Sequence, residues 1–185
     1  MKKTMYLECQ SGISGDMTVA ALLDLGADEE VLKKALSSLP VSGFQIQISR
    51  VKKAGLDVCD FDVLLDKVHE NHDHDMEYLH GHSHEHSHNH SAHAHHHHVH
   101  RGMKEIMDIL NAAALTDRAR ATAVRIFTIL GEAEAKAHGT TLEEVHFHEV
   151  GAVDSIVDIV SVAVCLDNLG IEEVIVPEIL SLIHI

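Results

Sequence analysis

Apolar residues recur at helical spacing in two windows near the N-terminus. The first window spans residues 16–25 and is followed by Gly26, and the second spans residues 28–39 and is followed by Pro40. Because glycine often follows the last turn of a helix and proline cannot continue one, both windows are predicted to be helices. A short strand over residues 4–8 precedes them.

A different pattern follows, in which apolar and polar residues alternate. The alternation runs through residues 44–49 and again through residues 59–65. A period of two is typical of strands with one buried face. The two runs are predicted to form a β-hairpin, with a turn of several residues near 52–55.

The second half of the chain returns to helical spacing. One helix is predicted over residues 103–112, and a longer one begins after Thr116, reaches about His138 and is closed by Gly139. Residues 154–169 are apolar almost all round, so that helix is expected to lie in the core.

Two short extended segments flank the core helix, residues 146–150 before it and residues 173–176 after it. The second of these is predicted to be a buried strand. Helices interleaved with strands predict an α/β (or α+β) layered domain with a small mixed sheet of four or five strands.

A histidine-rich segment, residues 66–102, interrupts this domain. Of the 19 histidines in the chain, 15 lie between His69 and His100. The segment is rich in Ser, Asn and Gly and has few large apolar residues, so it is predicted to be a disordered insertion. The domain itself is then discontinuous, with residues 1–65 and 103–178 folding together.

Imidazole nitrogen is a good ligand for nickel, zinc, copper and cobalt, so this insertion predicts metal binding. The alternatives are a purification tag or a low-complexity linker, and the internal, mixed character of the tract disfavours a tag. The candidate ligands alternate along one run and adjoin along another: His80, His82, His84, His86, His88, His90, His95, His96, His97 and His98.

Composition excludes several classes of function. The formal charge is −15 with neutral histidine, and aromatic residues make up 3% of the chain, which together argue against a nucleic-acid partner. No apolar run is long enough to span a membrane, and no signal peptide is recognisable. The three cysteines are far apart and form no CxxC pair, so a reducing cytoplasm is predicted.

A Gly/Ser-rich loop joins the first strand to the first helix. It reads Ser11-Gly12-Ile13-Ser14-Gly15-Asp16. Two glycines and a helix N-terminus could cradle a phosphate, which makes Ser11, Gly12, Ser14 and Gly15 candidate ligand-binding residues. The alternative is an ordinary helix start with Ser14 or Asp16 as the N-cap, since the motif is neither GxGxxG nor Walker A.

A second block, residues 146–158, combines imidazoles and carboxylates. On a strand His146 and His148 share a face, and on a helix so do Asp154 and Asp158, which predicts a metal site using His146, His148 and Asp154. The alternative is that Asp154 caps the helix and Asp158 favours its dipole. Asp158 stands out because its helix is otherwise apolar, and a buried carboxylate needs a partner or an ion. Cys9 is a possible soft ligand or simply a buried residue.

These two blocks, together with the internal His-rich insert, resemble the signature of the LarC family. The matching stretches are Tyr6–Cys9 with Ser11–Met17, and VHFHEVGAVDSIVD at residues 145–158. The resemblance implies insertion of nickel into pyridinium-3,5-bisthiocarboxylic acid mononucleotide, in a CTP-dependent, lyase-class cyclometallation supported by Mg or Mn. It implies that the His-rich loop supplies nickel and that Asp16, Glu149 and Asp158 carry the chemistry.

The resemblance covers about residues 4–178. The family continues into a CTP-associated domain that this chain does not reach, and residues 179–185 lack family character, so that tail is expected to be non-native. The alternative function is a non-catalytic buffer or metallochaperone for nickel, zinc or cobalt.

Overall fold

The computed structural model describes residues 2–10, 12–66, 101–147 and 151–177. The predictions made for the His-rich segment and for the tail fall on residues 67–100 and 178–185, outside the described residues. The same holds for the predicted roles of Ser11, His148 and Glu149.

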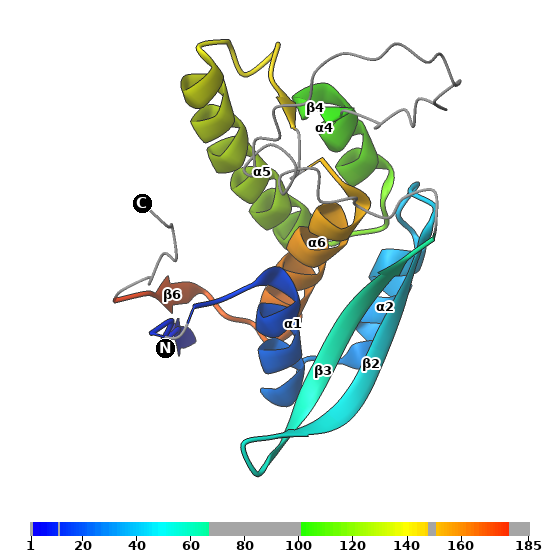
Figure 1. Ribbon diagram of the computed structural model, residues 1–185, viewed down its shortest axis with the longest axis vertical. Helices are drawn as coiled ribbons and strands as arrows, with labels where there is room; N and C mark the ends of the chain where they lie inside the picture. The colour runs from blue at the N-terminus through cyan, green and yellow to red at the C-terminus, as the bar shows by residue number, and fades with distance from the viewer. Residues whose placement is uncertain (1, 11, 67–100, 148–150, 178–185) are drawn as a thin grey trace, which may run out of the picture.

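The described chain forms five helices, of which three pack against the C-terminal helix α6 and one, α4, packs on α5 (Figure 1). Their bounds are α1 Gly15–Asp24, α2 Glu29–Ser37, α4 Met103–Ala112, α5 Asp117–His138 and α6 Val153–Asn168. Helix α6 contacts α1, α2 and α5. It also contacts strand β3, Leu56–Leu65, which packs on α1. Its Ile156, Val157 and Val160 are fully buried, which confirms the predicted core helix. Burial of such a side chain contributes about 1.5–3 kcal/mol.

The helix ends follow local sequence signals. The Asp28 carboxylate accepts the N–H groups of Glu30 and Val31 at the start of α2. Thr116 accepts the N–H of Ala119 at the start of α5, and Gly139, with φ +66°, ends α5 in the left-handed region. These caps confirm the predicted boundaries of α5, because each satisfies backbone groups that the helix leaves unpaired.

The hairpin is formed by β2 Phe44–Lys53 and β3 Leu56–Leu65, in register from Phe44 opposite Leu65 to Lys53 opposite Leu56. Its turn is shorter than predicted, because the alternation does not reveal where pairing stops. Ala54 and Gly55 alone make the turn, both with positive φ (51° and 82°), as a type I′ turn requires. The inward face of β3 packs on α1.

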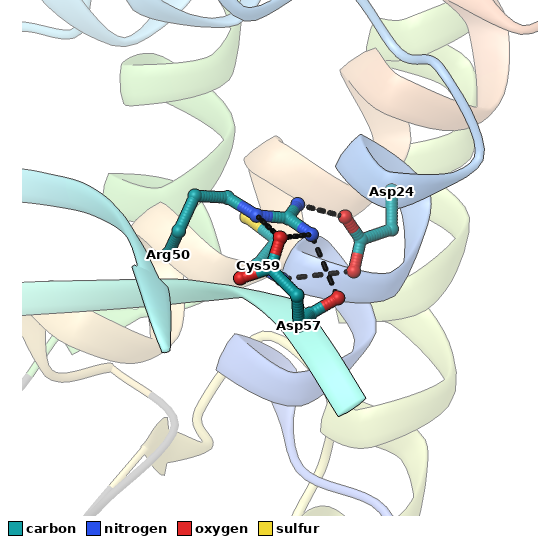
Figure 2. A network of polar contacts seen from close by, with 4 residues as sticks. All are labelled: Asp24, Arg50, Asp57 and Cys59. Atoms are coloured by element: carbon teal, nitrogen blue, oxygen red, sulfur yellow. Dashed lines mark hydrogen bonds and ion pairs between the residues drawn. The ribbon is translucent and has the colours of Figure 1, made fainter. Parts of the chain in front are cut away.

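An ion-pair network ties this hairpin to the C-terminal end of α1 (Figure 2). One oxygen of Asp24 accepts the backbone N–H of Cys59 at 2.8 Å, and the other accepts a hydrogen bond from Arg50. Arg50 also contacts the Asp57 carboxylate, at 3.0 Å from Nη2 and 3.2 Å from Nε. The hydrogen bonds that Asp24 accepts from the Cys59 backbone and from Arg50 hold its pKa below the usual value.

The strands do not form the single mixed sheet that was predicted. Within the described ranges they form three two-stranded sheets: β2 with β3, β1 Thr4–Tyr6 parallel to β6 Glu173–Ile175, and β4 Arg101–Gly102 antiparallel to β5 His146–Phe147. The prediction was wrong because alternation identifies strands but carries no information about which strands pair across the intervening helices.

The placement of β6 also differs from the prediction of a buried strand. All three of its residues are exposed. No helix in the part of the chain that the structure describes is both long enough and apolar enough to cross a membrane.

Candidate functional site

The beginning of α1 rests directly on Asp158, in the second turn of α6. A Cβ atom added to Gly15 would lie 2.3 Å from Asp158 Oδ2 and 2.7 Å from its Cγ. Only a residue without a side chain fits there. Gly15 therefore allows the N-terminus of α1 to approach a carboxylate of α6 at van der Waals distance.

The Asp158 carboxylate sits in an unusual electrostatic environment. Burial raises its pKa from 3.8 to about 6, and the neighbouring Asp16 and Asp154 carboxylates add to that rise. A hydrogen bond from the backbone N–H of Asp16 opposes it. Asp158 Oδ1 is buried and accepts no hydrogen bond from any described group. A buried carboxylate oxygen without a donor is a place for a proton or a cation.

Three of the acids singled out by sequence, Asp16, Asp154 and Asp158, thus belong to one acidic cluster. Asp16 lies in the first turn of α1 and accepts a hydrogen bond from the Ser14 hydroxyl. Asp154 lies in the first turn of α6, one turn before Asp158. Sequence separates the two helices by more than a hundred residues, and the fold brings their N-terminal turns together.

The alternative explanations of these residues as helix caps describe only part of the structure. Ser14 is at the N-cap position of α1, but its side chain makes no capping hydrogen bond. The N-cap of α6 is Ala152 and not Asp154, whose Oδ1 accepts the adjacent N–H of Ser155 at 2.8 Å. The anion at the N-terminus of α1 is the Asp158 carboxylate. A substrate phosphate at this N-terminus would have to compete with it.

The predicted imidazole ligand His146 lies on β5, opposite Gly102 of β4, and its side chain is exposed. The next residue, Phe147, is buried and packs edge-on against Phe127, with ring centroids 6.3 Å apart. Among the residues with described positions, no three His, Cys, Asp or Glu side chains are arranged to hold a metal ion.

Arg101 marks a feature that sequence reasoning missed. It is partly buried on β4, and its guanidinium donates a hydrogen bond of 2.7 Å to the carbonyl of Gly151, just before α6. Burial lowers its pKa. In sequence it is one base at the border of the His-rich segment, and only the pairing of β4 with β5 brings it to the loop before α6.

Ser161 was also missed. It is fully buried on α6, and its hydroxyl makes no hydrogen bond with any described group. The sequence could have shown it, because Asp154, Asp158 and Ser161 follow the spacing i, i+4, i+7 and so form one polar stripe on a mostly apolar helix.

The cysteines are free and buried, as the sequence predicted for a chain without a disulfide framework. Burial raises the pKa of Cys165 to about 12 and raises that of Cys59. Burial therefore favours the neutral thiol at both positions. Cys9 is 2% exposed, in agreement with its interpretation as a buried residue.

A pocket of about 220 Å³ runs between α1 and β3, beginning at Asp16 and continuing past Met17 toward Asp60. Ligand pockets usually measure about 300–1,000 Å³. The pocket therefore offers open space next to the acidic cluster without enclosing a ligand.

Comparison with known proteins places the chain. Residues 5–181 match the family model described as nickel insertion protein. The chain is similar to the pyridinium-3,5-bisthiocarboxylic acid mononucleotide nickel insertion protein of Alkaliphilus metalliredigens, with 52% identity over 180 residues, covering 97% of the chain and 40% of the relative. The proteins of the same name in Akkermansia muciniphila and Staphylococcus saprophyticus are 43% and 34% identical, over 93% and 94% of this chain and 37% of each relative.

The chain thus spans about two fifths of the length of the curated relatives it matches. No solved structure matches it. The family match and the aligned relatives both cover nearly the whole chain. Both include the two sequence blocks that contribute Asp16, Asp154 and Asp158. The chain belongs to the nickel insertion protein family.

Proposed function

We propose that this chain takes part in inserting nickel into pyridinium-3,5-bisthiocarboxylic acid mononucleotide, which forms a nickel-pincer cofactor. The match of residues 5–181 to the nickel insertion family carries the proposal. The acidic cluster supports it through Asp158, because a cation at this buried carboxylate would offset the nearby charges of Asp16 and Asp154.

In the reaction, nickel is a substrate that replaces the hydrogen on a pyridinium ring carbon. A carbon–nickel bond forms, the carbon–hydrogen bond breaks, and the proton must go to a base. We assign that role to Asp158, because a pKa of about 6 makes it a stronger base than an ordinary aspartate while leaving it mostly ionised at neutral pH. Among the residues that the structure describes, none donates a hydrogen bond to its Oδ1.

The remaining assignments rest on the family resemblance. They are a lyase-class reaction, dependence on CTP with Mg or Mn, and a part for Glu149 in the chemistry. The cysteine pattern supports a cytoplasmic location. The sequence pattern of residues 146–158 supports metal-ligand roles for His146, His148 and Asp154. The loop residues Ser11, Gly12, Ser14 and Gly15 are assigned to binding a phosphate of the substrate, because of their glycines and the helix N-terminus that follows. Gly15 also leaves room for the Asp158 carboxylate, with which such a phosphate would compete.

The test uses a chimaera in which residues 5–178 of this chain replace the matching segment of the Alkaliphilus metalliredigens relative. It is incubated with the mononucleotide, CTP, Mn²⁺ and Ni²⁺, and nickel-pincer absorbance is recorded. Absorbance comparable to that of the intact relative supports the proposal. A folded chimaera without absorbance, alongside an active intact relative, would contradict it.

The alternative function, a nickel buffer without chemistry, is favoured by the 15 histidines between His69 and His100. Deletion of residues 69–98 from the chimaera separates the two functions. An insertion protein keeps its activity at high external nickel and loses it only when nickel is scarce. A buffer loses its function at both concentrations.

A further inference from the structure

The parallel pair β1–β6 lies at one side of the molecule, across α1 and α6 from the hairpin (Figure 1). Its register pairs Thr4, Met5 and Tyr6 with Glu173, Val174 and Ile175. Leu7 N–H donates to the Ile175 carbonyl at 2.9 Å, and Glu172 N–H donates to the Lys3 carbonyl at 2.8 Å. The sheet therefore has ordinary backbone pairing and two strands in the described part of the chain.

Several large apolar side chains of this sheet and its end are exposed. Tyr6 is 61% exposed, and the consecutive residues Val174, Ile175 and Val176 are 41%, 45% and 38% exposed. Consecutive residues of a strand point to opposite faces, so both faces of β6 are open. An apolar run of this kind is typical of a parallel strand covered on both faces.

A sheet of two three-residue strands does not stabilise itself in water, and parallel sheets with uncovered faces are rare. The outer edges of β1 and β6 also leave backbone groups available for another strand. The sequence of β6 is typical of a buried strand, but the described residues leave β6 exposed. We therefore expect further polypeptide to cover it.

We propose that the β1–β6 sheet is a docking edge for a further β-strand with apolar residues on both faces, supplied in the longer relatives by chain outside the matched segment. More than half of each relative lies outside that segment, so the family provides ample chain for such a strand.

The exposed positions allow a direct test, because the three native cysteines are buried. Val174→Cys is introduced into the 185-residue chain and into the chimaera, and the rate of maleimide labelling is measured. Leu56→Cys at the hairpin turn, where the native side chain is 67% exposed, is the matched control. Covering the sheet should slow labelling at position 174 by at least about tenfold in the chimaera and leave position 56 unchanged.

Equal labelling of position 174 in both proteins would overturn the proposal. Protection that appears in the 185-residue chain alone and grows with its concentration would also overturn it, since a second copy would then be the occupant. If the chimaera labels at its native cysteines, it has not folded. The cysteines are then placed at the aligned positions of the intact Alkaliphilus metalliredigens protein, where slow labelling at 174 and fast labelling at 56 support the proposal and fast labelling at both overturns it.

Discussion

The two ends of α1 carry the same residue type in opposite circumstances. At the C-terminal end, Asp24 accepts hydrogen bonds from Arg50 and from the backbone of Cys59, and its pKa is lowered. At the N-terminal end, Asp16 lies against Asp158, whose pKa is raised to about 6 by burial and by neighbouring acids. The C-terminal end of α1 is joined to the hairpin through Asp24. At the N-terminal end, Asp16 and Asp158 lie together, and no described cationic side chain neutralises their charge.

This difference separates a structural role from a functional one. A carboxylate whose partners are supplied by the fold stabilises the fold and has little left to offer a ligand. A carboxylate held in place without such partners costs stability and is retained where it serves chemistry. Substitutions at the two ends of α1 should therefore have opposite effects.

The largest effect is expected from Asp158→Asn in the chimaera. Loss of the proton acceptor should lower the rate of nickel-pincer formation by about 100-fold or more, the usual contribution of a general base. Circular dichroism should show an unchanged fold. Asp108→Asn on the exposed side of α4 is the control and should insert nickel at the normal rate. An Asp158→Asn rate within a factor of a few of that control would remove Asp158 from the reaction.

Gly15→Ala should come next. The added methyl group would meet the Asp158 carboxylate at 2.3 Å, and overpacking of this kind costs about 1–3 kcal/mol of unfolding free energy. Urea unfolding of the 185-residue chain measures the loss. The double variant Gly15→Ala with Asp158→Gly should recover most of it, because the clash is then absent. Additive losses in the double variant would show that the two residues do not contact each other.

The third prediction concerns pH. The folded-state pKa of Asp158, about 6, exceeds its ordinary value of 3.8, so protonation favours the fold. This contribution is fully present below about pH 4 and is lost as pH rises through 6. After allowance for solvent screening, Asp158→Asn should gain about 1–2 kcal/mol relative to the parent chain between pH 4.5 and 7.5.

Urea titrations at the two pH values give this difference, and titration of the His-rich segment cancels because both proteins contain it. A gap between variant and parent that does not change with pH would mean that Asp158 titrates normally.

The smallest effect on insertion is expected from Asp24→Asn, which instead weakens the fold. Loss of the charge removes the ion pair with Arg50, so the melting temperature should fall while the insertion rate in the chimaera at 25 °C stays normal. Asp62→Asn on the exposed face of β3 should leave both unchanged. A large loss of insertion with Asp24→Asn would contradict the division between the two ends of α1.

Local pattern was enough to predict much of this fold. The alternation over residues 44–65 identified the hairpin, and Thr116 and Gly139 marked the ends of α5, because these signals depend on nearby residues alone. Asp158 was recognisable as an acidic residue in the middle of a mostly apolar helix. Its contact with Gly15 was not, since that contact depends on how two helices far apart in sequence pack.

The exposure of β6 is a second feature that the local sequence pattern did not predict. Its sequence predicted burial, and the described residues leave it exposed. An apolar strand sequence predicts that the strand is buried in the folded protein. It does not show whether the described residues are the ones that cover it.

The titration of Asp158 itself tests the central claim most directly. Carbon-13 NMR of aspartate-labelled chain lacking residues 69–98, with Asp158→Asn to assign the signal, follows the carboxyl group with and without Zn²⁺ as a diamagnetic stand-in for nickel. The predicted result is a pKa of about 6 without metal and a lower value with it. A pKa near 3.8 that does not respond to the metal would contradict the account.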